Sequence, residues 1–366
     1  MAAVDPTPPK QAQTPPDEAR VAETVRTKLP FPADLLALAP LAGDASNRRY
    51  FRLQLVGGPP RTLVLMQLAD PEGFKQSEEA VSKASAPVTE LPFVNILNHL
   101  IKAEVPVPML HFYDQTAGLV YLEDLGDLTL ADASADATDP MTPAFYRYAV
   151  DTLVHLHIKA THPEDPGCLA FSRAFDVPLL MWEFDHFIEY GIEKRSGRLL
   201  PEAERQAIRA EMQAVAELLA GQPRVFTHSD YHSRNLMMQD GRLRIIDFQD
   251  ALMGPASYDL ASLLRDSYLT LGEELIEELV VRYLEGRAKA GAPLDRLAFM
   301  RLFDLTSIQR NLKAAGRFVY IEKVKGNDRY LPYIPRTLAN VKRNLNRHRQ
   351  LHRLRDLLAR HVPELQ

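Results

Sequence analysis

The sequence predicts an α+β protein of two lobes, a small β-rich lobe near the N-terminus and a larger α-rich lobe after it. In the first part, short apolar runs are separated by small residues at 43–47 and by a Gly/Pro break at 57–60, as in strands joined by turns. In the second part, apolar residues recur every three or four positions, as on one face of a helix. At roughly 150 residues per domain, 366 residues correspond to about two domains, and 46% hydrophobic content is enough for two cores. We therefore expect a tail (1–18) followed by two lobes.

The composition restricts the partners and the cellular compartment. The net charge is -5 and no basic stripe dominates the chain, so nucleic acid is not an expected partner. Cys168 is the only cysteine, which excludes an internal disulfide and fits a reducing compartment. No apolar run has the length of a membrane span, and the start lacks the apolar core of a secretory signal. The sequence predicts a cytoplasmic protein without a membrane partner, and it leaves the oligomeric state open.

The elements of the N-terminal lobe follow from local patterns. Five prolines among small polar residues predict that the tail is disordered. A short helix is expected at 19–29, and residues 41–53 have the pattern of two strands around a small-residue turn. With the apolar strand at 62–68 they form a three-stranded meander. A helix at 92–102 and further strands ending in the run 119–127 complete this part.

The elements of the C-terminal lobe are mostly helical. Phe145, Thr152 and Leu156 belong to a set of apolar positions at helical spacing, which indicates a helix buried along one face. Asp259 is expected to open a later helix as its N-cap and to support the structure rather than to react. The basic stretch 336–355 has apolar residues at near-helical spacing, which predicts an amphipathic terminal helix.

The most informative segment joins a polar loop to a predicted hairpin. Apolar runs flank Asp240 and Gly241, a dipeptide suited to the positive φ angles of a two-residue turn. If that turn forms, Asn235 pairs opposite Ile246. The Asn235 amide then lies beside the carboxylate of Asp247, the residue that follows the second strand, while Asp230 lies on the loop just upstream.

This convergence has the residue types that phosphoryl transfer needs. That reaction asks a protein for positioning and charge neutralisation, so an aspartate near the acceptor hydroxyl and an Asn/Asp pair on Mg²⁺ form a sufficient set. Mg²⁺ takes a few protein oxygens and completes its octahedron with water and substrate phosphates. We therefore assign Asp230 as the catalytic base and Asn235 and Asp247 as metal ligands.

The motif allows two other interpretations. The polar residues could be ordinary loop and cap residues, since Asp and Asn are favoured in turns. Alternatively, His228, Asp230 and His232 could present metal ligands of a hydrolase from an extended segment. Such a site usually recruits further histidines, and no second histidine motif of comparable quality is present.

The segment 228–235 and the sequence Ile246-Asp247-Phe248 resemble two motifs of the aminoglycoside phosphotransferase/choline kinase branch of the protein-kinase-like fold. The resemblance implies ATP and Mg²⁺ as cofactors. It also implies a hinge in the run 119–127, which divides a nucleotide-binding N-terminal lobe (19–124) from a catalytic and substrate-binding C-terminal lobe (125–366). It also implies that His228 is a structural brace for the loop, that Ser46 and Asn47 lie in a turn covering the ATP phosphates, and that the backbone of Glu123 and Leu125 binds adenine.

One departure from that resemblance concerns the phosphates. Kinases normally carry a lysine on the third strand, whereas residues 64–67 read Val-Leu-Met-Gln. Arg48 or Arg49, beside the expected phosphate turn, could supply the cation, since arginine binds phosphate well. Both could equally lie on a solvent face.

Further stretches are similar to those of bacterial N-acetylmuramate/N-acetylglucosamine anomeric kinases. These are residues 43–52, 122–127, 247–251 and 309–313. The resemblance implies ATP-dependent phosphorylation of the anomeric hydroxyl of an amino sugar, giving the 1-phosphate in cell-wall recycling. Trp182, Glu183 and Asp185 could then bind the sugar acceptor and Arg310 a lactyl carboxylate, although all four could also be core or surface residues. The alternatives are a kinase for another acceptor, such as an aminoglycoside or a choline-like molecule, and a nucleotide-binding pseudokinase scaffold.

Overall fold

The protein consists of two compact units in a computed structural model of the chain. The first unit comprises Met1–Gln76 and Pro108–Asp124, and the second comprises Ser77–Val107 and Leu125–Gln366. The structure describes residues 14–41, 48–68, 90–136 and 139–366. The sequence-based division at residues 124 and 125 lies at a break between the units, whereas the segment up to Val107 belongs to the second unit.

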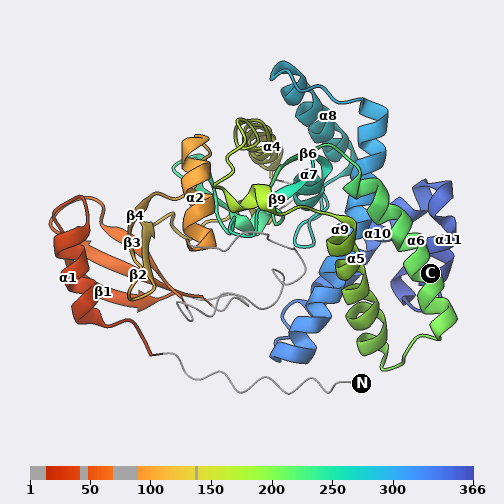
Figure 1. Ribbon diagram of the computed structural model, residues 1–366, viewed down its shortest axis with the longest axis horizontal. Helices are drawn as coiled ribbons and strands as arrows, with labels where there is room; N and C mark the ends of the chain where they lie inside the picture. The colour runs from red at the N-terminus through yellow and green to blue at the C-terminus, as the bar shows by residue number, and fades with distance from the viewer. Residues whose placement is uncertain (1–13, 42–47, 69–89, 137–138) are drawn as a thin grey trace. The chain divides into compact units, whose positions relative to one another are not determined.

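The first unit contains a five-stranded antiparallel sheet with the order β1-β2-β3-β5-β4 (Figure 1). Its strands are β1 (Asp34–Pro40), β2 (Arg49–Val56), β3 (Thr62–Gln67), β4 (Leu110–Asp114) and β5 (Leu119–Glu123). The predicted three-stranded meander is confirmed as β1-β2-β3, with its first strand slightly earlier in the chain than the pattern indicated. The residues between β1 and β2 include the predicted phosphate turn, and residues 42–47 lie outside the described part of the chain.

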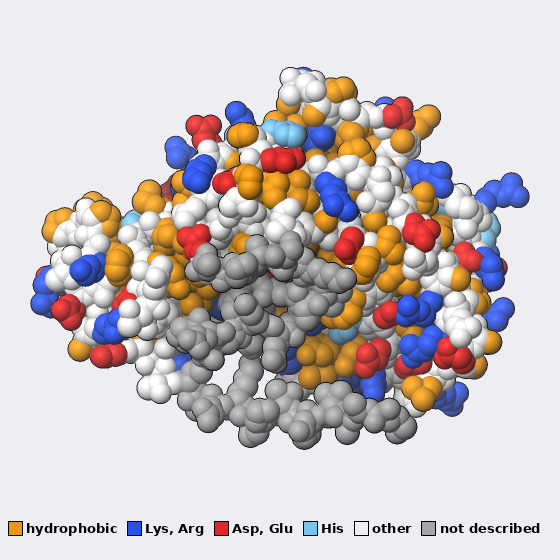
Figure 2. All heavy atoms as spheres, viewed as in Figure 1, with side chains coloured by type: hydrophobic (Ala, Val, Ile, Leu, Met, Phe, Trp, Pro, Cys, Tyr) orange, Lys and Arg blue, Asp and Glu red, His pale blue; other side chains and the backbone are white. Residues whose placement is uncertain are grey.

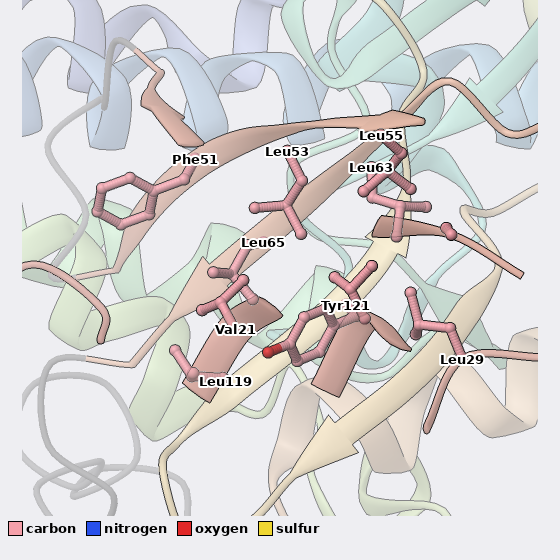
Figure 3. Packing of buried hydrophobic residues seen from close by; sticks show 11 residues of the cluster. Val21, Leu29, Phe51, Leu53, Leu55, Leu63, Leu65, Leu119 and Tyr121 are labelled. Atoms are coloured by element: carbon pink, nitrogen blue, oxygen red, sulfur yellow. The ribbon is translucent and has the colours of Figure 1, made fainter. Parts of the chain in front are cut away.

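A helix covers one face of this sheet and closes its core. Helix α1 (Glu18–Lys28) begins after Asp17, whose carboxylate accepts hydrogen bonds from the first-turn amides of Ala19 and Arg20. Alternate residues of β2 and β3 point to the same face of the sheet, because side chains alternate along a strand. Figure 3 shows the buried cluster that results, drawn from α1 with its C-cap and from β2, β3 and β5: Val21, Leu29, Phe51, Leu53, Leu55, Leu63, Leu65, Leu119 and Tyr121.

The second unit is largely helical, with two short β ribbons that are joined by residues 228–235, the functional loop. Its helices are α2 (Pro92–Lys102), α3 (Leu130–Ala133), α4 (Thr142–Lys159), α5 (Val177–His186), a π-helix (Phe187–Lys194), α6 (Glu202–Ala220), α7 (Ser257–Leu264), α8 (Glu273–Lys289), α9 (Arg296–Lys325), α10 (Ile334–Arg347) and α11 (His352–Ala359). Strand β6 (Arg224–Thr227) pairs with β9 (Leu252–Pro255), and β7 (Leu236–Gln239) pairs with β8 (Arg242–Ile245). Helix α2 has the bounds predicted from the sequence.

Helix α9 is the central element of the second unit. It packs against α7 and α10 and against the π-helix, and most of its central residues are buried. Gly316 permits the close approach of the π-helix, because a Cβ there would lie 2.8 Å from the Cα of Phe187. The approach sets the side chains of α9 beside those of α5 and the π-helix.

The predicted terminal helix at 336–355 is divided into α10 and α11. His348 has an extended backbone with φ of -114°, and its Nε2 lies 2.8 Å from Oδ2 of the buried Asp304. A single helix was predicted because Leu338, Val341 and Leu345 fit helical spacing, and these three residues are indeed buried. The interruption depends on a partner distant in sequence, which the local pattern does not contain.

Within the described residues, no helix is both long enough and apolar enough to cross a membrane.

Candidate active site

The β7–β8 hairpin fixes the register of the site. Asp240 and Gly241 have φ of 50° and 71°, the left-handed values that a tight two-residue turn requires. The amide of Ile246 donates to the carbonyl of Asn235 at 3.0 Å, so the predicted pairing of these two residues is confirmed. Asp247 follows directly, and its Oδ2 lies 3.5 Å from the Asn235 side-chain nitrogen.

His228 joins the functional loop to the hairpin. Its Nε2 donates to the carbonyl of Ile246 at 2.9 Å, and its Nδ1 accepts from the amide of Asp230 at 3.2 Å. This pair of contacts requires a neutral ring with the proton on Nε2. The bracing role expected for His228 is thus confirmed by the geometry. Because both ring nitrogens are occupied, His228 is not a metal ligand in this arrangement.

The carboxylate of Asp259, on α7, also supports the loop through hydrogen bonds. Its Oδ2 accepts from the amide of His228 at 2.7 Å and its Oδ1 from the amide of Ser229 at 3.0 Å. Ser229 has φ of 75°, a strained value for a residue with a side chain, so the loop conformation depends on this support. Asp259 is fully buried and also contacts Nε2 of His157 at 3.1 Å. The supporting role is as predicted.

The expected N-cap role of Asp259 is wrong. Helix α7 has Ala256 at its N-cap, and Asp259 lies within the first turn. Its carboxylate turns away from its own helix because two unpaired loop amides provide better donors than the amides of a helix that has already begun. The sequence motif therefore marks a contact between α7 and the functional loop.

Asp230 lies among positive charges. Nη2 of Arg310 donates to its Oδ1 at 3.1 Å, and the Asp230 side chain keeps 45% of its surface exposed, so a substrate hydroxyl can reach it. Burial alone would raise the pKa of the Asp230 carboxyl, but the charges of Lys313 and Arg310 outweigh burial and hold that pKa well below its usual range. Asp230 is therefore anionic at neutral pH and is held in a fixed direction by Arg310.

Asn235 and Asp247 form a donor set that fits Mg²⁺. The side-chain nitrogen of Asn235 donates to the carbonyl of Asp230 at 3.0 Å, and within the described residues no hydrogen bond uses its Oδ1. One amide oxygen and one carboxylate are hard ligands of the kind Mg²⁺ prefers, with water and phosphates filling the remaining positions. Asp247 has φ of 65°, a left-handed strain of the type that accumulates at functional sites.

The metallohydrolase alternative finds no support here. Among the residues that the structure describes, no group of three or more His, Cys, Asp or Glu side chains is placed to hold a metal ion.

The predicted acceptor residues lie on α5 and α9, but their environments differ. Glu183 is buried, and its carboxylate receives Lys313 Nζ and Gln309 Nε2, each at 2.5 Å. Asp185 is paired with Arg209 at the other side of α5. Trp182 is partly buried and stacks on His186 with ring centroids 5.7 Å apart. Arg310 contacts the proposed base itself, so its guanidinium is already engaged.

The predicted nucleotide residues belong mainly to the first unit. Ser46 and Asn47 lie outside the described residues. Arg49 begins β2, and its guanidinium carbon lies 5.1 Å from the ring centroid of Phe51. Glu123 ends β5 and donates its amide to the carbonyl of Met109 at 2.9 Å. The other two predicted residues, Arg48 and Leu125, precede β2 and follow β5.

Several supporting residues were missed by the sequence analysis. Gln249 is buried, and its Nε2 donates to Oδ1 of Asp247 and to Oδ2 of Asp250, each at 3.0 Å, which orients the metal-ligand carboxylate. Asp266 accepts from both the amide and the hydroxyl of Ser233 and so fixes the other end of the loop. Lys313 was not singled out either. The motif at 247–251 contained Gln249, but nothing in it showed that this residue turns back toward Asp247.

A pocket of about 710 Å³ elsewhere in the second unit is not this site. Phe171, Arg173, Arg224 and Met253 are among the residues that line it, and none of the described base, metal-ligand or acceptor residues does.

Comparisons with known proteins show the family of this chain. Residues 37–293 match the phosphotransferase enzyme family, which is more than half of the chain. The chain belongs to that family. An N-acetylmuramate/N-acetylglucosamine kinase of Neisseria meningitidis serogroup B is 34% identical over 320 residues, covering 87% of this chain and 88% of the relative. The enzyme of the same name from Pseudomonas putida is 31% identical over 326 residues, covering 88% of each.

Solved structures show the fold. A choline/ethanolamine kinase family protein from Mesorhizobium loti has a TM-score of 0.56 at 15% identity and covers 95% of this chain and 98% of its own. An ADP-bound aminoglycoside phosphotransferase has a TM-score of 0.56 at 14% identity, covering 91% of this chain and 99% of its own. The predicted protein-kinase-like α+β fold is therefore confirmed. The protein is a small-molecule kinase that acts on an alcohol-type acceptor.

Proposed function

We propose that this kinase transfers a phosphoryl group from ATP, with Mg²⁺, to the anomeric hydroxyl of N-acetylmuramate, N-acetylglucosamine or both, giving the sugar 1-phosphate. The observation that carries the proposal is the convergence of Asp230, Asn235 and Asp247 at the open end of one hairpin. The names of the relatives support an amino-sugar acceptor. A cytoplasmic role in cell-wall recycling follows from this reaction.

Asp230 is proposed to orient the acceptor hydroxyl and to accept its proton late in the transfer. An anomeric hydroxyl is more acidic than an ordinary alcohol, so a carboxylate that is only weakly basic is sufficient. The positive charges around Asp230 lower its basicity, which fits such an acceptor better than it fits an ordinary alcohol. Arg310 keeps the carboxylate in place while the hydroxyl approaches.

Asn235 and Asp247 are proposed to hold Mg²⁺ through one amide oxygen and one carboxylate. When bound, the metal ion neutralises phosphate charge and helps to position the transferred group. Gln249 keeps the Asp247 carboxylate directed toward that position. Arg48 or Arg49 is proposed to bind the phosphates in place of the missing strand lysine, together with the turn that includes Ser46 and Asn47.

The adenine base is proposed to bind to the backbone of Glu123 and Leu125. The amide of Glu123 already donates to the carbonyl of Met109, so the contact of Glu123 with adenine would use its carbonyl group.

The names of the relatives favour a sugar over the cationic acceptors, aminoglycosides and choline-like molecules. The charges beside the proposed base do not decide between them, because Arg310 is paired with Asp230 and Lys313 with Glu183. The pseudokinase alternative is disfavoured because Asp259, His228 and Gln249 all support the base and the metal ligands, and a scaffold has no need of them.

Comparing four acceptors in one assay tests this proposal. The purified enzyme is incubated with ATP and Mg²⁺ and with N-acetylmuramate, N-acetylglucosamine, an aminoglycoside or choline, and ADP release is measured. We expect ADP release with at least one of the two sugars above the blank without acceptor, and none with the cationic acceptors. Phosphorylation of choline or an aminoglycoside alone would contradict the proposal, and the Asp230→Asn variant serves as the catalytic blank.

A further inference from the structure

Helix α9 presents a row of polar and aromatic side chains that starts at the proposed base. Arg310 contacts Asp230, and Lys313, Arg317 and Tyr320 follow at intervals of three or four residues. Such spacing keeps side chains on one face of a helix. At 1.5 Å per residue, Arg317 lies about 10 Å along the helix axis from Arg310. The row therefore leads from the reacting hydroxyl to a point about two helical turns away.

Arg317 differs from the other two cations in this row. Arg310 is bound to Asp230, and Lys313 is bound to the buried Glu183. Arg317 is partly buried, and its guanidinium carbon lies 4.8 Å from the ring centroid of Tyr320. Among the residues that the structure describes, its guanidinium forms no hydrogen bond and no ion pair. A cation held against an aromatic face with its donors unused is suited to receive an anion.

The facing wall is aromatic. His186 stacks on Trp182, and its ring centroid lies 4.7 Å from that of Tyr190 and 5.3 Å from that of Tyr320. Tyr190 and Tyr320 meet edge to face at 5.1 Å. All four rings are partly exposed, although aromatic side chains are usually buried when the surroundings allow it. In Figure 2, a hydrophobic patch lies just below the place where Figure 1 labels α5 and α9, with Lys and Arg side chains beside it.

His186 contributes no charge to this wall at neutral pH. Burial first, and then the positive charges of Arg317 and Lys313, lower the pKa of His186 to about 4. Its Nε2 is buried and has no hydrogen-bond partner within the described residues. The face thus combines aromatic rings with the cation of Arg317, and the carboxylate of Glu189 lies beside Tyr190. Rings with a few placed polar groups are typical of ligand sites.

We propose that Arg317 binds a carboxylate carried by the acceptor sugar, while the sugar ring packs between Asp230 and the aromatic rings of His186, Tyr190 and Tyr320. This inference rests on the proposed function and replaces the expectation that Arg310 receives the lactyl group. The lactyl group is attached through O3, two ring carbons away from the anomeric carbon, and its arm carries the carboxylate farther from the anomeric hydroxyl. Long side chains on a helix lean toward its N-terminus, so the Arg317 side chain leans along α9 toward Arg310 and shortens the offset of about 10 Å that the sugar and its lactyl arm have to span. Arg317 is therefore the residue that distinguishes N-acetylmuramate from N-acetylglucosamine.

The test uses two acceptors that differ in the lactyl group. Arg317→Met removes the charge and keeps an unbranched, flexible side chain. We expect kcat/KM for N-acetylmuramate to fall about 10- to 100-fold, the loss associated with one charge-assisted contact, and mainly through KM. For N-acetylglucosamine we expect a change within about threefold, as for a substitution that removes no contact. Arg317→Lys should retain part of the preference and carries the test if the methionine variant does not fold.

Arg301→Met is the matched control, because Arg301 is an exposed arginine on the same helix. It should leave both acceptors unchanged. Equal losses for the two sugars, or no loss for N-acetylmuramate, overturn the inference while the proposed function stands. A wild-type enzyme that phosphorylates neither sugar overturns the proposed function, and the inference falls with it.

Discussion

The support of the functional loop by Asp259 can be tested with a substitution that hardly changes shape. In Asp259→Asn, one carboxylate oxygen becomes an NH₂ group, so either the amide of His228 or that of Ser229 loses its acceptor. Losing a hydrogen bond to a charged group costs about 1.5–3 kcal/mol, and an unsatisfied buried donor adds about 1–3 kcal/mol. The free energy of unfolding should therefore fall by about 2.5–6 kcal/mol. Ser229 can then relax from its φ of 75°, which displaces Asp230.

Urea unfolding and steady-state kinetics with saturating ATP and sugar measure the two effects. We expect kcat to fall at least about tenfold, because a misplacement near 1 Å is costly in a reaction governed by positioning. Asp295→Asn is the control, since Asp295 is an exposed N-cap of α9 whose carboxylate accepts from the amide of Ala298 at 2.8 Å. It should cost at most about 1 kcal/mol and leave kcat unchanged. An Asp259→Asn enzyme with normal stability and normal kcat would refute the reasoning.

Four further predictions follow from the same contacts. Asp230→Asn should keep ATP binding and lower turnover by about 100-fold or more, and near-normal turnover would remove Asp230 from the mechanism. Asp247→Ala should abolish Mg²⁺-dependent nucleotide binding in calorimetry, because it removes the single carboxylate of the donor pair; an unchanged affinity would show that the metal ion is held elsewhere. Of Arg48→Ala and Arg49→Ala, one should weaken ATP binding by about 1.5–3 kcal/mol and the other should be mild, since Arg48 directly precedes β2 and successive residues of an extended chain point to opposite faces; two mild effects would show that other groups bind the phosphates. The pKa of His186 is lowered from 6.5 to about 4, so the stability that its neutral form contributes is present above pH 6.5 and is lost as the pH falls toward 4. Between pH 6.5 and 4, the free energy of unfolding of His186→Gln, measured with urea, should fall by about 1–2 kcal/mol less than that of the wild type. This figure allows for the partial exposure of the ring. Identical dependences of stability on pH would contradict the prediction.

The parts of the site that were predicted from the sequence are those with local causes. Asp240 and Gly241 specify a tight turn, and the turn fixes the register that brings Asn235 opposite Ile246. Position in the chain then sets Asp247 and Asp230 near that pair. Helix α2 was predicted within its bounds because Pro92 marks its start and its apolar residues repeat at helical spacing.

The parts that were missed depend on contacts between residues distant in sequence. Glu183 resembles a surface residue that could bind a sugar, and only the packing of α5 against α9 buries it with Lys313. Asp259 was correctly expected to support the structure, but its target lies on a loop about thirty residues away. Tertiary context decided both environments, and local propensity does not contain that information.

The most direct test of the central claim is the position of the phosphate in the product. Phosphorus–proton correlation NMR on the product of wild-type enzyme, ATP, Mg²⁺ and either amino sugar identifies the proton coupled to phosphorus. The account predicts coupling to the anomeric proton, as in a sugar 1-phosphate. Coupling to the methylene protons at C6, or to any other ring position, would contradict it.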